Sequence, residues 1–450
     1  MRMAETLLKR LLAGGAWALA GKFVTAGSEL LALGLLARLL SDDHFGAYML
    51  AYTTITGGAM LAQVGLHMAV VRFVAEFIGT GRPEKARRVV VRCAQLLFVG
   101  CLVIGSILAF GGGSWLARSV WNSSTLAAAM GAVAIWAVLR AIQVFVSEAF
   151  RGLKDIRLAT VFGGTIARVL FLALLFYVSH TSGSLQLIDA VYMISAATAF
   201  SLLISVTLLA IRISRLPVGG TMGVREILGV STPMWVTGLT ALVLTQFDLW
   251  VMGAFFSEDQ VGVYGAAARL VTVVSMSLTL VNLVVPPFIA DLYARGEREQ
   301  LQRVLRATAT FAGLPAFLVL ATFIFAGGTV LSLVYEPRFA EGATILALLS
   351  AGRLVNVLTG SCGITLGMTG HQRYLMGITL VVGVGMVTSA LLVRDHYGTV
   401  GIATVACVGI IVHNLAMWLT TRWVAGLWTH VGIPRPHEMR TLYGRIVGRR

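Results

Sequence analysis

Twelve long apolar runs, separated by short polar breaks, dominate this sequence of 450 residues. Each run has about 20 residues or more, which is the length that a helix needs to cross the roughly 30 Å hydrocarbon core of a bilayer. A lone strand could not satisfy its backbone hydrogen bonds in lipid, so each run must be helical. We therefore predict an all-α membrane protein with about twelve transmembrane helices, at residues 12–40, 46–70, 89–110, 125–147, 159–178, 187–211, 229–255, 262–288, 307–328, 343–367, 374–393 and 399–425.

The composition agrees with a chain whose solvent is lipid. Hydrophobic residues make up 57% of the chain and charged residues only 12%, about half the charged share of a soluble protein. The twelve spans leave no room for a separate soluble domain of ordinary size. The four cysteines, Cys93, Cys101, Cys362 and Cys407, all lie in apolar segments without CxxC or Cys/His spacing, so we expect no disulfide framework, no metal site and no cofactor.

The Lys and Arg residues fall on one side of the predicted membrane. The breaks 72–92, 148–158, 212–228 and 291–306, together with both ends of the chain, hold many cations, whereas the opposite breaks hold only Arg118, Arg338 and Arg394. The positive-inside rule then predicts cytoplasmic N- and C-termini in a multi-pass protein. This asymmetry also explains the net charge of +15, and we expect no nucleic acid as a partner.

The second half of the chain repeats features of the first half at a constant offset. Ser41-Asp42-Asp43-His44-Phe45-Gly46-Ala47-Tyr48 corresponds to Ser257-Glu258-Asp259-Gln260-Val261-Gly262-Val263-Tyr264, and at the same offset Arg157 falls on Arg373. Six spans separate the copies, so both halves keep the same orientation, as in parallel repeats related by a pseudo-two-fold axis along the membrane normal. We predict an N-terminal six-helix lobe at 1–215, a C-terminal six-helix lobe at 216–425 and a basic cytoplasmic tail at 426–450, with a central cavity between the lobes.

Charged residues inside the predicted spans are the candidates for function. A cation at the membrane centre costs about 2.5–3.5 kcal/mol or more, and such residues face a wet cavity or a partner. Arg38 lies near an exterior end and can snorkel, and Arg168 has no evident acidic partner. The other cations lie on polar stripes at helical spacing, which include Lys22 with Thr25 and Glu29, Arg140 with Gln143, Arg269 with Asn282, and Arg353 with Asn356; a further stripe holds Gln63 and His67.

Two interpretations of these stripes remain open. They could line a cavity, or they could be interhelical hydrogen bonds and buried ion pairs, such as Lys22 with Glu29. Asp248 has the same ambiguity, because a lone acid in a span is either a cation or proton site or a partner for Arg269.

The opening spans carry a family resemblance. The strings Leu35-Leu36-Ala37-Arg38-Leu39-Leu40-Ser41-Asp42-Asp43-His44-Phe45-Gly46-Ala47-Tyr48, Gln63-Val64-Gly65-Leu66 and Val71-Arg72-Phe73-Val74-Ala75-Glu76 resemble bacterial polysaccharide-export flippases. These are the Wzx-type O-antigen and capsule transporters of the multidrug/oligosaccharidyl-lipid/polysaccharide (MOP) exporter superfamily.

The resemblance implies a function in surface polysaccharide and lipopolysaccharide biosynthesis. A protein of this family is a transporter and not an enzyme, and it moves an undecaprenyl-pyrophosphate-linked oligosaccharide across the bacterial cytoplasmic (inner) membrane by alternating access. We expect it to act as a monomer among membrane lipids, in contact with polysaccharide assembly machinery.

The same resemblance assigns roles to the polar stripes, because related flippases line their cavity with spans 1, 2 and 8. Arg and Lys in a low-dielectric cavity suit a pyrophosphate, and Thr, Ser, Asn and Gln suit sugar hydroxyls. We therefore expect substrate binding by Lys22, Arg269, Arg353, Arg140, Asn282 and Gln63, and a coupling-ion site at Asp248 or Glu29.

Three other functions compete with this interpretation. An ion-coupled exporter of cationic drugs in the same superfamily should have an acidic cavity, whereas these spans hold more Lys and Arg than Asp and Glu. A lipid II flippase usually has two further C-terminal spans. A membrane polymerase or glycosyltransferase generally needs acidic or His groups on a sizeable loop, and the exterior loops here are short.

Overall fold

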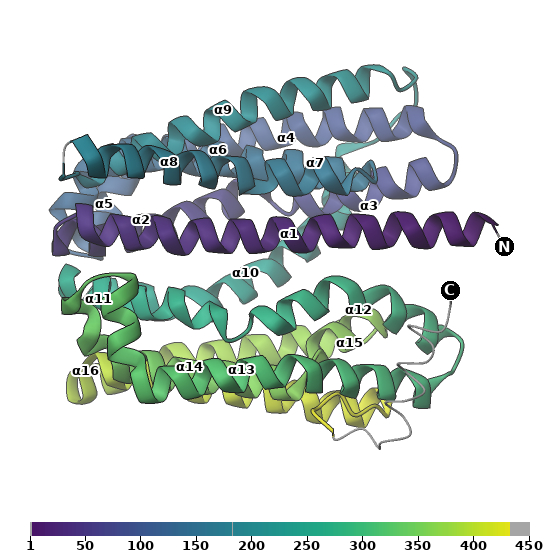
Figure 1. Cartoon of the computed structure of the whole chain (residues 1–450). Helices are drawn as coiled ribbons and strands as arrows, with labels where there is room; N and C mark the ends of the chain where they lie inside the picture. Colours follow the sequence, from purple (N-terminus) through teal and green to yellow (C-terminus); the bar gives the residue numbers. More distant parts are fainter. Residues whose placement is uncertain (1, 182, 433–450) are drawn as a thin grey trace. The chain divides into compact units, whose positions relative to one another are not determined.

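The computed structural model describes residues 2–181 and 183–432, and the regular structure in these ranges is helical. Figure 1 shows the helices in chain order. The first half comprises α1 (Arg2–Leu39), α2 (Asp42–Gln63), α3 (Leu66–Gly79), α4 (Pro83–Ala109), α5 (Gly112–Ser119), α6 (Ser124–Gly152), α7 (Ile156–Thr160), the π-helix η1 (Val161–Thr165), α8 (Ile166–Thr181) and α9 (Leu187–Ser214). The second half comprises α10 (Val224–Phe255), α11 (Glu258–Leu270), the 3-10 helix η2 (Val271–Val273), α12 (Met276–Ala294), α13 (Arg298–Val334), the 3-10 helix η3 (Pro337–Gly342), α14 (Ala343–Thr359), α15 (Cys362–Met368) and α16 (Gln372–Ala425).

The helices account for all twelve predicted spans. Ten are long and apolar enough to cross a membrane on their own, and the pair α2 and α3, bent by 50°, adds an eleventh. Helix α16 has 54 residues with a break at Gly398, and a straight helix of that length would be about 80 Å long. It therefore contains both of the last two predicted spans, and the prediction of about twelve transmembrane helices is confirmed.

The break between the third and fourth predicted spans is more ordered than a polar loop. It contains the short helix α5. Trp121, which follows α5, is 6% exposed. A tryptophan so deeply covered is part of the packed interior.

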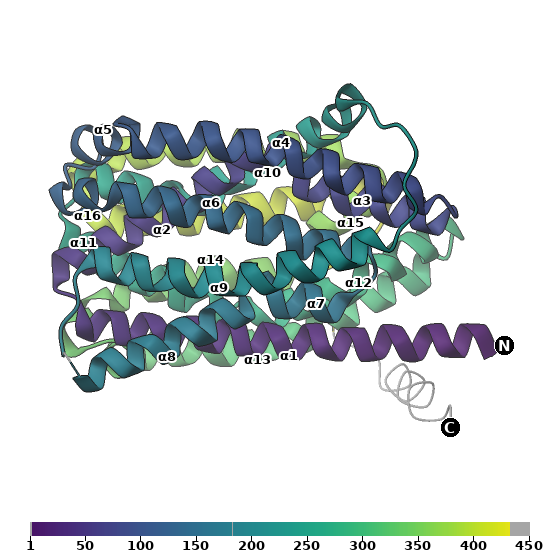
Figure 2. The same ribbon diagram turned by 90° about the horizontal axis from the view of Figure 1, so that it is seen from above.

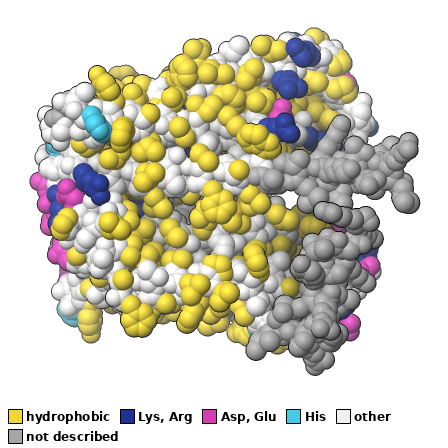
Figure 3. Space-filling model, in the orientation of Figure 1, with side chains coloured by type: hydrophobic (Ala, Val, Ile, Leu, Met, Phe, Trp, Pro, Cys, Tyr) yellow, Lys and Arg dark blue, Asp and Glu magenta, His cyan; other side chains and the backbone are white. Residues whose placement is uncertain are grey.

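The lateral surface is apolar, as a lipid solvent requires. Large hydrophobic side chains such as Phe98, Phe176, Phe311 and Phe325 are exposed. Figure 3 shows hydrophobic side chains along the helices, with Lys, Arg, Asp and Glu side chains gathered toward the helix ends. A soluble protein rarely exposes so large an apolar area, so this surface is the one that faces acyl chains.

The chain forms two compact units, each with its own interior. The first unit comprises residues 1–266 and 329–342, and the second comprises 267–328 and 343–450. In the first unit α6 packs against α2, α3, α4 and α9, and Figure 2 shows α4 and α9 on either side of α6. In the second unit α14 and α15 pack against α16.

Helix boundaries recur at the offset that relates Ser41 to Ser257. Helix α2 begins at Asp42 and α11 at Glu258, and α7 begins at Ile156 and α16 at Gln372. The turn before each of the latter two helices also contains a residue with positive φ, Lys154 (φ 63°) and Gly370 (φ 83°). The division into lobes at 215/216 remains a prediction, and the predicted basic tail at 426–450 lies outside the described residues from 433 onward.

Two arginines connect the ends of α1 and α13 within the first unit. Arg38 of α1 donates from Nε to the carbonyl oxygen of Tyr335 at 2.9 Å and from Nη2 to that of Leu333 at 3.0 Å. Arg338 of η3 donates to the carbonyl oxygens of Ala37 and Leu40 at 2.5 and 3.4 Å. Arg38 of α1 therefore caps backbone carbonyls at the end of α13, and Arg338 of η3 caps those at the end of α1.

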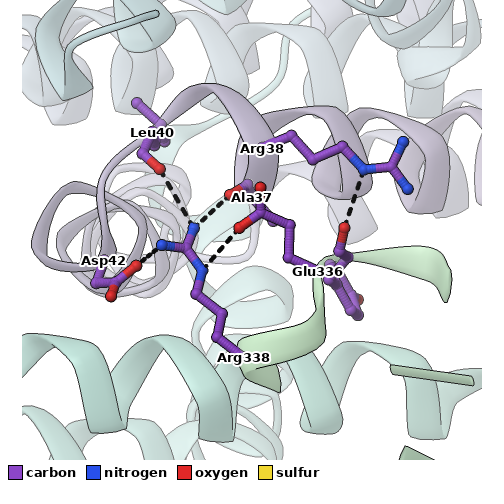
Figure 4. Close-up of polar contacts among 7 residues, drawn as sticks. Ala37, Arg38, Leu40, Asp42, Glu336 and Arg338 are labelled. Atoms are coloured by element: carbon purple, nitrogen blue, oxygen red, sulfur yellow. Dashed lines mark hydrogen bonds and ion pairs between the residues drawn. The ribbon is translucent and has the colours of Figure 1, made fainter. Parts of the chain in front are cut away.

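Figure 4 shows how Arg338 lies between acidic side chains. It forms ion pairs with Asp42 at the start of α2 and with Glu336, the latter at 3.0 Å. These contacts explain why residues 329–342 belong to the first unit although they lie far along the chain.

Candidate functional site

A break in the fifth span creates the setting for a polar cluster in the first unit. Helix α7 passes into the π-helix η1 and then into α8, and Gly164 in η1 has φ 131°, which is not a helical value. The pair Gly163-Gly164 permits this conformation because glycine has no Cβ. Helix α1 packs against α7, η1 and α8, so its polar stripe faces the break.

Glu29 on α1 forms an ion pair with Arg168 on α8. The distance from Arg168 Nε to Glu29 Oε2 is 3.2 Å, and both side chains are largely buried, with exposures of 19% and 29%. Tyr52 on α2 donates its hydroxyl to Glu29 Oε1 at 3.3 Å. Glu29 is thus the acidic partner of Arg168 that the sequence did not reveal. The ion pair of Glu29 is with Arg168 and not with Lys22, which the sequence had suggested.

Arg140 on α6 lies beside this pair. It donates to Gln143 Oε1 at 2.8 Å, one turn further along α6. A Cβ built on Gly164 would lie 3.5 Å from Nη1 of Arg140 and would overlap Nη1 of Arg168. The missing side chain of Gly164 therefore leaves the space in which two guanidinium groups approach each other.

Lys22 completes the cluster on α1. The residue is exposed, and it makes no hydrogen bond or ion pair with any part of the chain that the structure describes. It does lie within electrostatic range of Arg151, Arg168, Arg140 and Glu29. One turn away, Thr25 shares a 2.7 Å hydrogen bond with Thr165 of η1, which ties the stripe of α1 to the break.

The charges of this cluster do not cancel. Lys22, Arg140 and Arg168 contribute three positive charges and Glu29 contributes one negative charge, while the neighbouring Arg151 and Glu148 form an ion pair with each other. Excess positive charge away from bulk water has a strong preference for an anion. The cluster can therefore bind a phosphate or carboxylate, and its hydroxyl and amide groups can bind a polyol.

Two further predicted residues lie in the first unit outside this cluster. Gln63 is 3% exposed and donates to the carbonyl oxygen of Ala141 at 3.2 Å, which is the contact of an interhelical hydrogen bond. Asp248 on α10 accepts a hydrogen bond from the hydroxyl of Tyr264 at 3.1 Å.

The remaining predicted residues belong to the second unit. Asn282 on α12 accepts from Ser361 Oγ at 2.6 Å, between α14 and α15. Arg353 lies on α14, one turn before Asn356, which donates to Asn414 at 2.6 Å. Arg269 lies in the last turn of α11, next to η2, and η2 packs against α14.

The sequence stripes found some members of the cluster and missed others. Lys22, Glu29 and Arg140 were singled out by helical spacing, whereas the involvement of Tyr52, Thr165 and Gly164 was not. The adjacent glycines 163–164 inside an apolar run were the available signal, because kinks in helices often lie at pairs of small residues such as glycine.

Metal and thiol chemistry find no support in the described ranges. These contain no group of three or more His, Cys, Asp or Glu side chains placed to hold a metal ion. All four cysteines are buried and unpaired by disulfides.

Burial also shifts the pKa of groups that lie outside the spans and away from the cluster. Burial raises the pKa of the Glu258 carboxyl at the start of α11. Burial and the positive charge of Arg306 lower the pKa of the His430 imidazole.

Comparisons with solved structures define the class of fold. An inward-facing multidrug resistance MATE family transporter of the MOP superfamily matches with a TM-score of 0.74 and 16% identity, over 89% of this chain and 94% of that one. The lipid II flippase MurJ in an inward closed conformation matches with a TM-score of 0.64 and 13% identity, over 90% and 87%. A MOP superfamily transporter from Pyrococcus furiosus, described as having a binding pocket of reversed polarity, matches with a TM-score of 0.64 and 16% identity, over 92% and 95%.

This fold, built from membrane-spanning helices, is similar to that of transporters of the MOP superfamily. The model of the family described as "Polysaccharide biosynthesis protein" matches residues 11–293. The chain belongs to this family, which confirms the resemblance seen in the opening spans. A comparison with curated protein sequences gives no match.

Proposed function

We propose that this protein is a flippase that moves a lipid-pyrophosphate-linked oligosaccharide across the bacterial cytoplasmic membrane by alternating access, for O-antigen or related surface polysaccharide. The family supports a role in polysaccharide biosynthesis. The observation that carries the substrate class is the excess of positive charge in the polar cluster around Gly164, with Lys22 exposed and unpaired in the described chain.

The chemistry of the cluster suits a pyrophosphate. Guanidinium and ammonium groups form short charge-assisted hydrogen bonds with phosphate oxygens. The Glu29 carboxylate already accepts from Arg168 and Tyr52, so it leaves Lys22 and Arg140 to attract the anion. Thr25, Thr165 and Gln143 supply hydroxyl and amide groups for sugars.

Further residues complete the proposal. Arg269, Arg353 and Asn282 in the second unit and Gln63 in the first are proposed as additional substrate-binding residues. Glu29 and Asp248 are proposed as sites of ion coupling, because each carboxylate accepts a hydrogen bond from a tyrosine, and protonation of the carboxylate would change that bond. The undecaprenyl carrier, the polysaccharide assembly machinery and action as a monomer belong to the same proposal.

Removing the charge of Lys22 tests the proposal directly. A charge-assisted hydrogen bond contributes roughly 1.5–3 kcal/mol, so Lys22→Ala or Lys22→Gln should weaken cargo binding by about one to two orders of magnitude. The measurement is the yield of surface polysaccharide in cells that depend on this protein, with the amount of protein in the membrane determined in parallel. Arg118→Gln, which removes an exposed cation of α5 outside the cluster, is the matched control and should not change the yield of polysaccharide.

The Lys22 result separates function from folding. Because Lys22 is exposed and makes no contact that a glutamine would break, both variants should reach the membrane at normal levels. Normal export by both variants would contradict the proposed cationic site. Lys22→Arg should restore export, since it keeps the charge.

The alternative function is an ion-coupled exporter of small cationic drugs, as the likeness to multidrug transporters would suggest. The cluster argues against it, because a cationic drug would meet three like charges and one carboxylate that is already paired. Resistance of expressing cells to cationic dyes, lost in Glu29→Gln but kept in Lys22→Gln, would favour the drug exporter over the flippase.

A further inference from the structure

A basic pocket lies at one end of the first unit, away from the polar cluster. It has a volume of about 600 Å³ and is lined at the ends of α3, α6 and α9 and the start of α7 by residues that include four cations: Lys154, Arg157, Arg212 and Arg215. Asp155 is the one acid among the lining residues, and it forms an ion pair with Arg212 at 3.3 Å. The pocket therefore keeps an excess positive charge.

An apolar groove begins beside this pocket. It has a volume of about 840 Å³ and runs between α4, α6 and α9, lined by exposed side chains such as Phe98, Leu102 and Val206. Ile213 and Ser214 line the groove, and Arg215 and Leu216 line the pocket. The two hollows therefore meet at the end of α9.

Arg87 marks the junction of the hollows. It lines the groove at the start of α4 and donates to the carbonyl oxygens of Ser214 and Leu216 at 3.5 and 2.9 Å. These bonds hold the end of α9 against α4. The pocket and the groove are thus parts of one amphipathic surface, with positive charge at its end and hydrocarbon along its length.

Lys154 supplies independent support for a binding role. Its φ of 63° is in the left-handed region, where a side chain is strained, and the corresponding turn in the second half of the chain has Gly370 with φ 83°. Strained non-glycine residues tend to occur at functional sites. Lysine at this position puts an exposed positive charge into the pocket wall, which glycine could not.

We propose that this surface binds an anionic phospholipid, with its phosphate in the basic pocket and an acyl chain in the adjoining groove. The positive-inside rule places this end in the cytoplasm, and basic pockets between transmembrane helices on that side bind anionic head groups. The site is independent of the proposed flippase activity.

Lipid binding to the purified full-length protein tests the proposal. Native mass spectrometry with phosphatidylglycerol, phosphatidylethanolamine and phosphatidylcholine should show preferential retention of phosphatidylglycerol. Lys154→Gly should weaken phosphatidylglycerol binding about fivefold, since each cation near a membrane surface contributes roughly that factor. The same substitution relieves the left-handed strain, so its melting temperature should equal or exceed that of the wild type.

Two further variants locate the lipid. Ala94→Trp introduces a large side chain at an exposed position that lines the groove. It should block the acyl chain of the lipid and weaken phosphatidylglycerol binding. Arg88→Gln, which removes an exposed cation at the same end but outside the pocket lining, should have less than a twofold effect.

Several outcomes would overturn the proposal. These are equal binding of the neutral lipids, unchanged phosphatidylglycerol binding in both Lys154→Gly and Ala94→Trp, displacement of the lipid by millimolar inorganic phosphate alone, and tighter binding of an isoprenyl phosphate than of phosphatidylglycerol. The last would assign the surface to the lipid carrier of the cargo.

Discussion

At the scale of single residues, Gly164 determines how the cationic cluster is built. Its backbone conformation, φ 131° and ψ −9°, interrupts the fifth span. Its missing Cβ leaves room for the guanidinium groups of Arg140 and Arg168. One glycine therefore makes the break and also the space that the break encloses.

Replacing this glycine should disturb both features. We expect Gly164→Ala to lower the stability of the protein by about 1–2 kcal/mol, because an L-residue is strained at this φ, and to displace Arg168 from Glu29. Thermal unfolding of the purified protein in detergent measures the first effect, and surface polysaccharide yield measures the second. Gly131→Ala on α6 is the control, because a Cβ added there would have no atom within 4 Å and alanine favours a helix. Equal melting temperatures for the two variants would refute the strain argument.

The polar stripes revealed candidate residues but could not assign their partners. Lys22 and Glu29 share a face of α1, but seven residues separate them, or about 10 Å along the axis, which is too far for a direct ion pair without bending both side chains. Arg168 reaches Glu29 from a neighbouring helix instead. That contact depends on how α1 and α8 pack, and spacing within one helix contains no information on it.

At the scale of elements, two arginines show how helix ends are stabilised across long sequence distances. Arg38 of α1 binds carbonyl groups at the end of α13, and Arg338 of η3 binds carbonyl groups at the end of α1. We had expected Arg38 simply to snorkel. The carbonyl groups at a helix C-terminus lack intrahelical partners, so an arginine near a helix end has better acceptors than water when another terminus lies beside it.

The two roles of Arg338 should differ in energy. Arg338→Ala removes the charged hydrogen bonds to Ala37 and Leu40 together with the ion pairs to Asp42 and Glu336, and it should cost about 2 kcal/mol. Asp42→Asn removes only an ion pair whose partners are 33% and 52% exposed, and it should cost less than about 1 kcal/mol. Melting temperatures in detergent should therefore fall more for Arg338→Ala than for Asp42→Asn. Equal losses for the two variants would show that the ion pair dominates.

Hydropathy predicted where the helices lie but not where they break. The spans agree with helices to within several residues at most boundaries, because lipid forces each apolar run into a helix. The breaks at Val64-Gly65, at η1 and at η2 depend on local backbone conformation and packing. Hydropathy does not reveal them, because the sequence stays apolar on both sides of each break.

At the scale of the whole molecule, the two halves of the chain agree more closely in their helix boundaries than in their residues. Few residues match between the halves, and yet the starts of α2 and α11, and those of α7 and α16, are separated by the same offset. The positive φ recurs as well, at Lys154 and Gly370. The backbone conformation of this turn is therefore the same in both halves, although the side chain differs. Because glycine would be the less strained residue, the lysine at position 154 points to a role for its side chain.

The sorting of charges predicts the orientation of the whole chain, and cysteine labelling can test it cleanly. The native cysteines are all buried, so a membrane-impermeant maleimide should leave the wild type unlabelled in intact cells. Asp259 and Glu299 are exposed, at opposite ends of the span formed by α11, η2 and α12. We expect Asp259→Cys to be labelled in intact cells and Glu299→Cys only after permeabilisation, because the break at 291–306 holds four arginines and a positively charged loop stays in the cytoplasm. Labelling of Glu299→Cys in intact cells would reverse the orientation, and it would move the basic pocket at Lys154 to the exterior, since both positions follow an even number of spans.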